Sequence, residues 1–206
     1  MIRGVWHKAI LAGCGLAALA LAAPAAAQLY SEGYKFLEAV KDRDGEEATQ
    51  MLETPGSTVI NARDLSSGET GLHIVVSQRN LVWVRWLLQE GANPNIADKQ
   101  GITPLIQAVR MGYIEGVEAL IAGGAQVDIA NNIGETPLIW AVHSRNLQLL
   151  EVLLEAGADA DRTDNAGRSA RAYASERGAD NRILAAIEEH ETPASERNTR
   201  IYGPSF

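Results

Sequence analysis

The chain has 206 residues, of which 46% are hydrophobic, 5% aromatic and 21% charged, and it carries a formal net charge of −8 at pH 7. An acidic surface disfavours the phosphate contacts on which affinity for nucleic acid and for anionic lipid depends, so we expect neither as a partner. A single cysteine cannot form a disulfide within the chain.

The N-terminal segment has the features of a secretory signal peptide. A basic start precedes an apolar run over residues 9–23, and Pro24 ends this run just before three alanines. This order of charge, apolar run and small residues is typical of an exported protein. A run of about 15 residues is shorter than the roughly 20 that a membrane-spanning helix needs, which favours a cleaved signal over an anchor. We expect residues 1–27 to be removed by a cut after Ala27, and the mature chain to act in the bacterial periplasm or after secretion.

The same segment holds a second and weaker export signal. Leu11-Ala12-Gly13-Cys14 resembles the bacterial lipobox, in which the cysteine becomes lipidated, but the strongest apolar stretch follows Cys14 instead of preceding it. Lipidation at Cys14 is therefore the alternative, and only in that case do we expect membrane attachment. Cleavage after Ala27 leaves 16 basic against 26 acidic residues, a net charge of −10, and no cysteine. Without a thiol, the mature chain has no disulfide, thiolate metal site or cysteine nucleophile.

A fixed period of 33 residues runs through the rest of the chain. Glycines stand at Gly68, Gly101, Gly134 and Gly167, and a hydroxyl residue follows two positions after each, at Thr70, Thr103, Thr136 and Ser169. The same spacing relates Leu72, Leu105 and Leu138. A period of this length with a Thr-Pro-Leu motif is the sequence pattern of ankyrin repeats.

In residues 101–105 and 134–138, which read Gly-Ile-Thr-Pro-Leu and Gly-Glu-Thr-Pro-Leu, the chain closely resembles the ankyrin-repeat family. The resemblance extends from about residue 31 to residue 189. It implies an all-α repeat solenoid, in which helix-turn-helix repeats stack side by side and carry β-hairpin or turn fingers. Residues 28–191 would form this domain, as about five repeats over residues 31–64, 65–97, 98–130, 131–163 and 164–190.

Elementary physical chemistry gives each repeated position a role. A threonine hydroxyl caps the free N–H groups of a helix start, and proline is tolerated in the first turn. Leu105 and Ala108 lie on one face of the helix that follows, where the small alanine lets helices approach closely. Residues 114–121 predict a second amphipathic helix, which Gly124 ends. One such pair cannot bury both of its faces, so neighbouring repeats must stack.

The two ends of the domain are expected to be capping repeats. At the first end, Ser31 is expected to N-cap a helix that carries Phe36 and Val40. In the last repeat Arg171 stands where a buried leucine is expected, and a polar outer face is what a terminal repeat requires for solubility. The period does not continue over residues 192–206, which we expect to be a flexible tail.

No constellation of residues predicts catalysis, a cofactor or a metal site. Asp159, Asp161 and Asp164 faintly resemble a calcium loop, but the twelfth position of such a loop needs a bidentate acid and holds Ala170. The histidines of the mature chain fall in three different repeats, without the spacing of metal ligands. The family resemblance implies that one of them, His73, makes a structural hydrogen bond between repeats. We therefore expect a protein that is not an enzyme and needs neither a metal nor a cofactor.

The family resemblance also indicates where a partner would bind. Ankyrin repeats usually hold partners with the finger tips and with the first helix of each repeat, which together line the concave face. Transferred by register, the centre of this surface is Arg110, Met111, Trp140 and His143; arginine and tryptophan are enriched at binding hot spots. The fingers contribute Lys99, Gln100, Ile102, Asn132, Ile133 and Glu135, and the second repeat adds Ser66, Ser67, Glu69, Ser77 and Gln78. The alternative is that Trp140 packs between first helices and Arg110 is merely solvated.

The sequence therefore predicts a non-enzymatic protein–protein interaction scaffold in the bacterial periplasm. It would bind an unidentified protein through the concave face and the fingers. The alternative function is a secreted effector or inhibitor that uses the same surface against a host or competitor protein. We expect the chain to be a monomer.

Overall fold

The structure is a computed structural model, and it describes residues 23–176 and 181–191. Residues 1–22, with Cys14 and most of the expected signal peptide, lie outside the described residues, as does the expected tail over 192–206. No helix among the described residues is both long enough and apolar enough to cross a membrane.

The described residues form α-helices in successive pairs, with one short 3-10 helix after the first pair. In chain order the elements are α1 (Ala23–Asp42), α2 (Gly45–Glu53), η1 (Val59–Asn61), α3 (Gly71–Ser77), α4 (Leu81–Gln89), α5 (Pro104–Arg110), α6 (Ile114–Ala122), α7 (Pro137–His143), α8 (Leu147–Glu155), α9 (Ala170–Ser175) and α10 (Asn181–Glu191). Extended backbone pairing in this part of the chain is limited to isolated bridges, Arg63 with Thr70 and Thr163 with Ser169.

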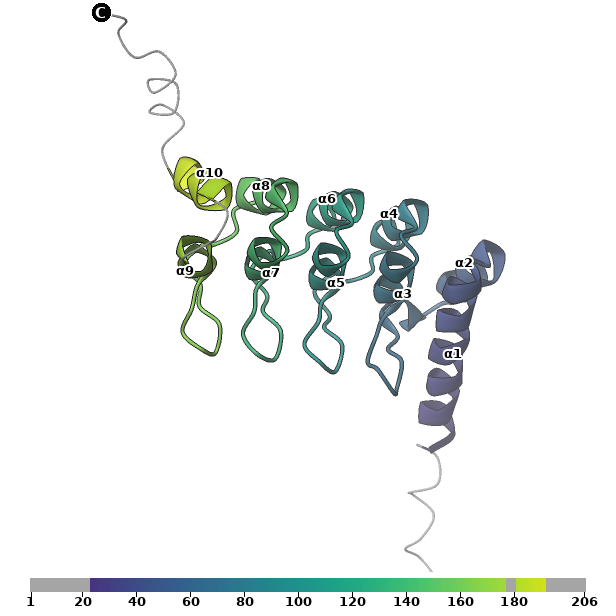
Figure 1. Cartoon of the computed structure of the whole chain (residues 1–206). Helices are drawn as coiled ribbons and strands as arrows, with labels where there is room; N and C mark the ends of the chain where they lie inside the picture. Colours follow the sequence, from purple (N-terminus) through teal and green to yellow (C-terminus); the bar gives the residue numbers. More distant parts are fainter. Residues whose placement is uncertain (1–22, 177–180, 192–206) are drawn as a thin grey trace, which may run out of the picture.

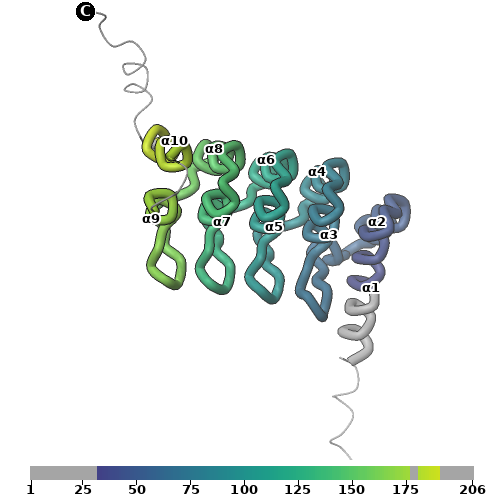
Figure 2. The backbone as a smooth tube through the Cα atoms, viewed as in Figure 1, coloured from purple at the N-terminus to yellow at the C-terminus, as the bar shows by residue number. Residues whose placement is uncertain are grey.

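The helix pairs stand side by side in a single row (Figure 1). The first helices α3, α5, α7 and α9 form one layer, the second helices α4, α6, α8 and α10 form the other, and the hairpin loops project beyond the first layer (Figures 1 and 2). Each first helix packs on the first helices of its neighbours, as α3 does with α1 and α5. This arrangement confirms the predicted all-α repeat solenoid.

The starts of the first helices follow the predicted capping chemistry. The Thr103 and Thr136 hydroxyls accept the backbone N–H of Ile106 and of Ile139, at 3.2 and 3.3 Å. Pro104 and Pro137 occupy the first turns of the same helices. The threonine side chain satisfies a free N–H donor at each helix start. The proline, which has no N–H, occupies a position where no donor is needed.

The α3 helix lacks the proline and is held at its start by His73 instead. The backbone N–H of Thr70 donates to His73 Nδ1 at 3.0 Å, and His73 Nε2 lies 2.9 Å from the carbonyl oxygen of Ile102 in the next repeat. Because Nδ1 accepts, the neutral ring carries its proton on Nε2 and donates it across the repeat boundary. The predicted structural hydrogen bond between repeats is confirmed. Burial lowers the pKa of His73 below its usual value of 6.5.

The core runs without interruption along the row of helices. Leu105, Leu138 and the second-helix residue Leu120 are 0% exposed, and Ala108 and Ala141 pack beside them at the helix contacts. Fully burying a leucine contributes about 1.5–3 kcal/mol relative to leaving it in water. Stability therefore accumulates at the repeat-to-repeat contacts, as expected of a solenoid.

The N-terminal repeat differs from its prediction at the helix start. Helix α1 begins at Ala23, so Ser31 lies inside it and does not cap it, contrary to our expectation. The alanines over residues 25–27 explain the difference, because alanine has the highest helix propensity and extends the helix backwards. The helix carries Phe36 and Val40, as predicted, and both are fully buried. The long α1 reaches down beside the first hairpin (Figure 1).

The C-terminal repeat replaces an apolar contact with an ionic one. Arg171 stands at the register of the buried leucines, and its Nε and Nη2 donate to the two carboxylate oxygens of Asp161 at 2.8 and 3.1 Å. The first residues of α10, Asn181 and Arg182, are exposed. Arg177 of the same repeat lies outside the described residues.

Candidate protein-binding surface

The candidate site is the exposed side of the first helices, which we call the first-helix face. It consists of two columns of residues spaced by 33 positions. The half-buried column is Ile74, Gln107, Trp140 and Tyr173, and the exposed column is Ser77, Arg110, His143 and Glu176. Repetition of the helix pair fixes where these side chains project, so their chemistry is free to vary along the row.

Arg110 and Trp140 come together across the boundary between α5 and α7. The guanidinium carbon of Arg110 lies 4.7 Å from the centre of the Trp140 ring. This is a cation–π contact, with a strength of about 0.5–1 kcal/mol at an exposed position. No carboxylate of the described residues forms an ion pair with Arg110, so its charge remains available to a partner.

His143 joins this pair to the last repeat. Its ring centre lies 6.3 Å from that of Trp140 and 4.4 Å from that of Tyr173, with an edge-to-face arrangement in both cases. Its Nδ1 lies 4.0 Å from a carboxylate oxygen of Glu135, at the base of the preceding hairpin. Trp140, His143 and Tyr173 therefore form one aromatic row across α7 and α9.

Tyr173 is fixed at the far end of this row. Its hydroxyl donates to the Asp164 carboxylate at 2.6 Å, while Arg168 covers its ring at 4.3 Å and pairs with Glu176 at 3.2 Å. The hydrogen bond lowers the pKa of Asp164 and raises that of Tyr173, because it stabilises the carboxylate and the protonated phenol. The ring is thus held by contacts on two sides.

Two polar atoms of the half-buried column have no hydrogen-bond partner among the described residues. They are the indole nitrogen of Trp140 and the side-chain oxygen of Gln107, and both atoms are covered from solvent. A covered donor or acceptor without a partner typically costs about 1–3 kcal/mol. The centre of the first-helix face therefore carries polar groups that its own fold leaves unsatisfied.

Met111 and Ile102 contribute less surface than their sequence positions indicated. Met111 is partly buried and packs against the core, and its carbonyl oxygen accepts a hydrogen bond from Arg79. Ile102 is only 7% exposed, and its carbonyl oxygen accepts from His73. The structure thus gives both residues contacts within the scaffold.

Residues at the tips of the hairpins link one hairpin to the next. The Asn132 side-chain amide donates to the carbonyl oxygen of Lys99 at 3.1 Å, and that of Asn165 donates to the carbonyl oxygen of Asn132 at 3.2 Å. The ammonium group of Lys99 donates to the carbonyl oxygen of Leu65. We call these contacts the hairpin ladder. The side chains of Gln100 and Ile133 are not part of the hairpin ladder. Gln100 is exposed, and Ile133 is 59% exposed.

The acidic segment of the last hairpin is occupied by internal hydrogen bonds. Asp161 holds Arg171, and Asp164 accepts from the Tyr173 hydroxyl and from backbone N–H groups. Asp159 accepts the backbone N–H of Asp161 at 2.9 Å. Over residues 23–176 and 181–191, no group of three or more histidine, cysteine or acidic residues is arranged to hold a metal ion.

Comparison with known proteins gives the family. The family model for ankyrin repeats matches residues 36–131 and 117–191, and so extends over most of the chain. The chain is an ankyrin-repeat protein. Ankyrin repeats generally mediate protein–protein interaction, and the family is typically non-enzymatic.

Two curated proteins show the extent of the similarity. This ankyrin-repeat protein is 47% identical over 51 residues, 25% of its length, to a Fowlpox virus (strain NVSL) protein named as an ankyrin repeat protein. It is 34% identical over 74 residues, 34% of its length, to oxysterol-binding protein homolog 1 of Saccharomyces cerevisiae (strain ATCC 204508 / S288c). It spans only 15% and 6% of the length of these two proteins.

The sequence prediction of this ankyrin-repeat protein's surface left out two residues that complete it. Tyr173 and Arg168 stand 33 positions after Trp140 and Glu135, so the repeat register itself could have identified them. We treated the last repeat as a cap alone, although its first helix extends the same face. The register also places Glu69 and Ile74 on this face two repeats earlier.

Proposed function

We propose that this ankyrin-repeat protein is a non-enzymatic scaffold that binds a protein partner through its first-helix face and hairpin tips. One observation carries the proposal. From Arg110 through Trp140 and His143 to Tyr173, ring and guanidinium contacts run across three repeats on one face.

Trp140 and Tyr173 pack partly on the core, but the repeat fold does not require rings or a guanidinium group at these positions. Two repeats earlier the same columns hold Ile74 and Ser77, and the core residues Leu72 and Val75 of that helix are still buried. Trp, Tyr and Arg are enriched among the few interface residues that dominate binding energy. Side chains that already rest on one another also lose less conformational entropy when a partner arrives.

We also propose that the protein acts in the bacterial periplasm after export. The support is the basic start, the apolar run and the alanines before Gln28. Cleavage after Ala27 shortens α1 but retains Phe36 and Val40, which are its fully buried contacts with the rest of the domain. The processed chain therefore keeps the core that the first repeat needs. Mass spectrometry of the native protein tests this, since a lipidated Cys14 at the N-terminus contradicts it.

The binding proposal is tested by removing exposed side chains that the core does not use. Arg110→Ala with His143→Ala should abolish crosslinked capture of the partner from periplasm, and should leave the melting temperature nearly unchanged because both residues are exposed. Glu151→Ala, on the exposed side of α8, is the matched control and should affect neither.

The outcomes discriminate between surfaces and between locations. If the double variant captures the partner and the Glu151 variant does not, the partner binds the second-helix side and our surface is wrong. Fractionation of cells and medium separates the periplasmic scaffold from a secreted effector, which would accumulate outside the cell.

A further inference from the structure

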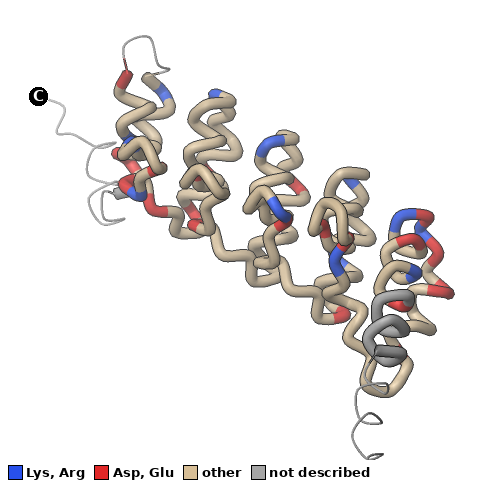
Figure 3. Tube along the Cα trace, turned by 90° about the horizontal axis from the view of Figure 1, so that it is seen from below, with Lys and Arg blue, Asp and Glu red and all other residues tan. Residues whose placement is uncertain are grey.

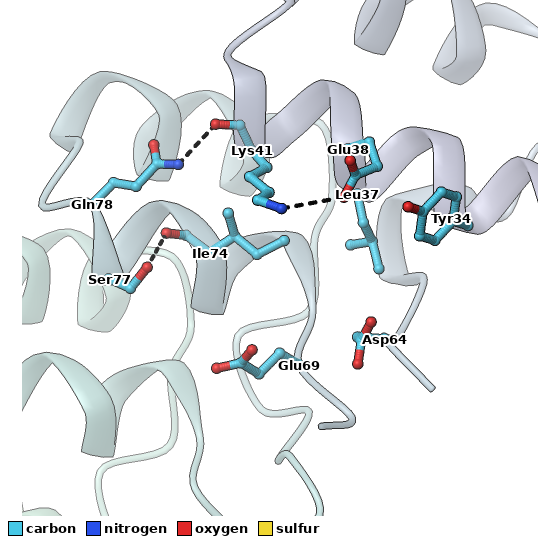
Figure 4. Close-up of a pocket in the computed structure, with 9 residues that line it drawn as sticks. All are labelled: Tyr34, Leu37, Glu38, Lys41, Asp64, Glu69, Ile74, Ser77 and Gln78. Atoms are coloured by element: carbon cyan, nitrogen blue, oxygen red, sulfur yellow. Dashed lines mark hydrogen bonds and ion pairs between the residues drawn. The ribbon is translucent and has the colours of Figure 1, made fainter. Parts of the chain in front are cut away.

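A cavity lies at the N-terminal end of the first-helix face, between α1, α3 and the first hairpin. Its volume is about 350 Å³, and it opens to solvent (Figure 4). One wall is the C-terminal half of α1, and the opposite wall is α3 with the first hairpin. The lining residues are Tyr34, Leu37, Glu38, Lys41, Asp64, Glu69, Ile74, Ser77 and Gln78.

The cavity has an apolar part and a charged part. Leu37 and Ile74 line it from facing helices, and the exposed Tyr34 ring stands at one side (Figure 4). The carboxylates of Asp64 and Glu69 lie at the hairpin side (Figure 4). This layout matches an amphipathic side chain, whose apolar stem packs on hydrocarbon while its charged head reaches a carboxylate.

The residues that line the cavity carry a net negative charge. Lys41 is the only cation among the lining residues, and its ammonium group pairs with Glu38 at 3.5 Å. Neither Asp64 nor Glu69 forms an ion pair with a described basic residue. Hydrogen bonds from Ser66 and Ser67 lower the pKa of Asp64 to about 2, so its charge persists at neutral pH.

Hydrogen bonds also fix the two carboxylates in place. Asp64 Oδ1 accepts from the backbone N–H groups of Ser66 and Ser67, both at 2.8 Å, which closes the hairpin turn. One Glu69 oxygen accepts from the Ser67 hydroxyl at 3.1 Å. Each carboxylate is thus oriented by one oxygen, and its second oxygen accepts no protein hydrogen bond that the structure records.

We propose that this cavity binds an arginine side chain of the partner protein. A guanidinium group is planar and carries five donors, so it can reach two oriented carboxylates at once, whereas the ammonium group of lysine acts as a point charge. The Tyr34 ring offers the arginine a face for a cation–π contact. The apolar stem of the arginine then covers Leu37 and Ile74.

The proposal rests on the proposed function, because it names the chemistry that the partner presents to the first-helix face. Ile74 and Ser77 of the cavity belong to the same two columns as Trp140 and His143. A partner segment that lies along the face would therefore place a basic residue between α1 and α3, and its following residues over Arg110 and Trp140.

The test titrates the purified protein with Nα-acetyl-arginine N-methylamide and follows the backbone amides by NMR. We expect a dissociation constant on the order of millimolar, with shifts at Ser66, Ser67 and Ile74, because a single side chain forms few contacts. The neutral citrulline derivative, which has nearly the same shape, should bind at least about tenfold more weakly, because it lacks the charge-assisted hydrogen bonds.

Two variants and a matched control locate the site. Asp64→Asn and Glu69→Gln retain an accepting oxygen but lose the charge, and each should weaken arginine binding about two- to fivefold, the range of a partly exposed ion pair. Asp98→Asn makes the same change at the same type of hairpin turn outside the cavity, where Asp98 accepts from Gln100 and Ile102, and it should have no effect.

Any of three results would overturn the inference. The arginine and citrulline derivatives bind equally, or the Asp64 and Asp98 changes have equal effects. The third is that the arginine derivative does not bind at 20 mM, a concentration about ten times the expected dissociation constant. These results leave capture of the partner untouched. Conversely, arginine binding in this cavity together with capture that survives the Arg110 and His143 changes would overturn only the proposed surface.

Discussion

The two ends of the first-helix face share a backbone and differ in chemistry. Next to α1 the face carries Ile74 and Ser77 above a cavity with unpaired carboxylates. From α5 to α9 the same register carries the cation of Arg110, which forms no ion pair with a described carboxylate, and the aromatic rings of Trp140, His143 and Tyr173. Figure 3 shows charged residues dense along the first helix pair and sparser along the interior pairs. The comparison teaches that repetition fixes the directions of these side chains while leaving their identities free.

We expect the largest effect from weakening the core that joins the two ends. Leu105 of α5 is 0% exposed and lies between them. Leu105→Ala should lower the free energy of unfolding by about 2–5 kcal/mol, because it removes buried methyl groups and leaves a cavity. Denaturant titration followed by circular dichroism measures the change. A midpoint equal to that of the parent protein would show that Leu105 is not at a core position.

A second prediction compares an interior hairpin with the terminal one. Gly101 and Gly167 have nearly the same positive φ, +78° and +76°. A Cβ at Gly101 would lie 2.6 Å from the backbone nitrogen of Asn132, whereas a Cβ at Gly167 meets nothing within 4 Å. Both changes to alanine place a side chain in the left-handed region at a cost of about 1–2 kcal/mol. Gly101→Ala should cost more, since the next hairpin must also move.

Thermal melting of the two alanine variants, side by side, decides this point. The Gly167 variant is the control for backbone strain alone, so the difference between the variants measures hairpin-to-hairpin packing. Equal melting temperatures would mean that the hairpins stack less tightly than their geometry indicates.

The smallest expected effect is the pH dependence of stability that comes from His73, which links α3 to the next repeat. His73 is neutral and buried, and its pKa lies below the ordinary 6.5. Below pH 6.5 the unfolded chain takes up a proton that the folded ring does not, so stability falls as pH falls. The slope cannot exceed about 1.4 kcal/mol per pH unit for one group. Well above pH 6.5 both states are neutral at His73, and its contribution is fully present.

Chemical denaturation between pH 5 and 7.5 measures this dependence, and His73→Gln should flatten it. The exposed His143 supplies the control, because His143→Gln replaces a histidine that is outside the core. Parallel pH profiles for the protein and its His73 variant would contradict the assignment of the slope to His73.

Much of the fold could be predicted because each repeat poses the same physical problem. Thr103 and Thr136 had to satisfy free donors at a helix start, and Leu105 and Leu138 had to fill the gap between neighbours. These constraints are local or recur at a fixed spacing, so one sequence reveals them. Ser31 failed as a helix start because the preceding alanines can continue the helix, which a capping rule alone does not weigh.

The candidate surface was harder to predict, since position along the repeat does not say what a side chain touches. The sequence placed Ile102 on the surface, but its side chain is only 7% exposed and its own carbonyl oxygen accepts from His73. The ring contacts of Trp140 with Arg110 and of His143 with Tyr173 cross repeat boundaries and depend on rotamers. The cavity beside Asp64 lies between α1 and α3, at the repeat where the sequence pattern is weakest.

The hairpin ladder has a consequence for how such a protein can lengthen. Asn132 donates to the carbonyl oxygen of Lys99, and Asn165 donates to that of Asn132, so these two contacts use the same kind of donor and the same kind of acceptor one repeat earlier. Consider a duplicated segment of 33 residues inserted at Asn132. Its asparagine amide would donate to the carbonyl oxygen of the preceding repeat, and its own carbonyl oxygen would accept from the asparagine of the following repeat. Gene duplication could therefore add a repeat that uses the existing kind of contact. Selection could then change the length of the binding face one repeat at a time.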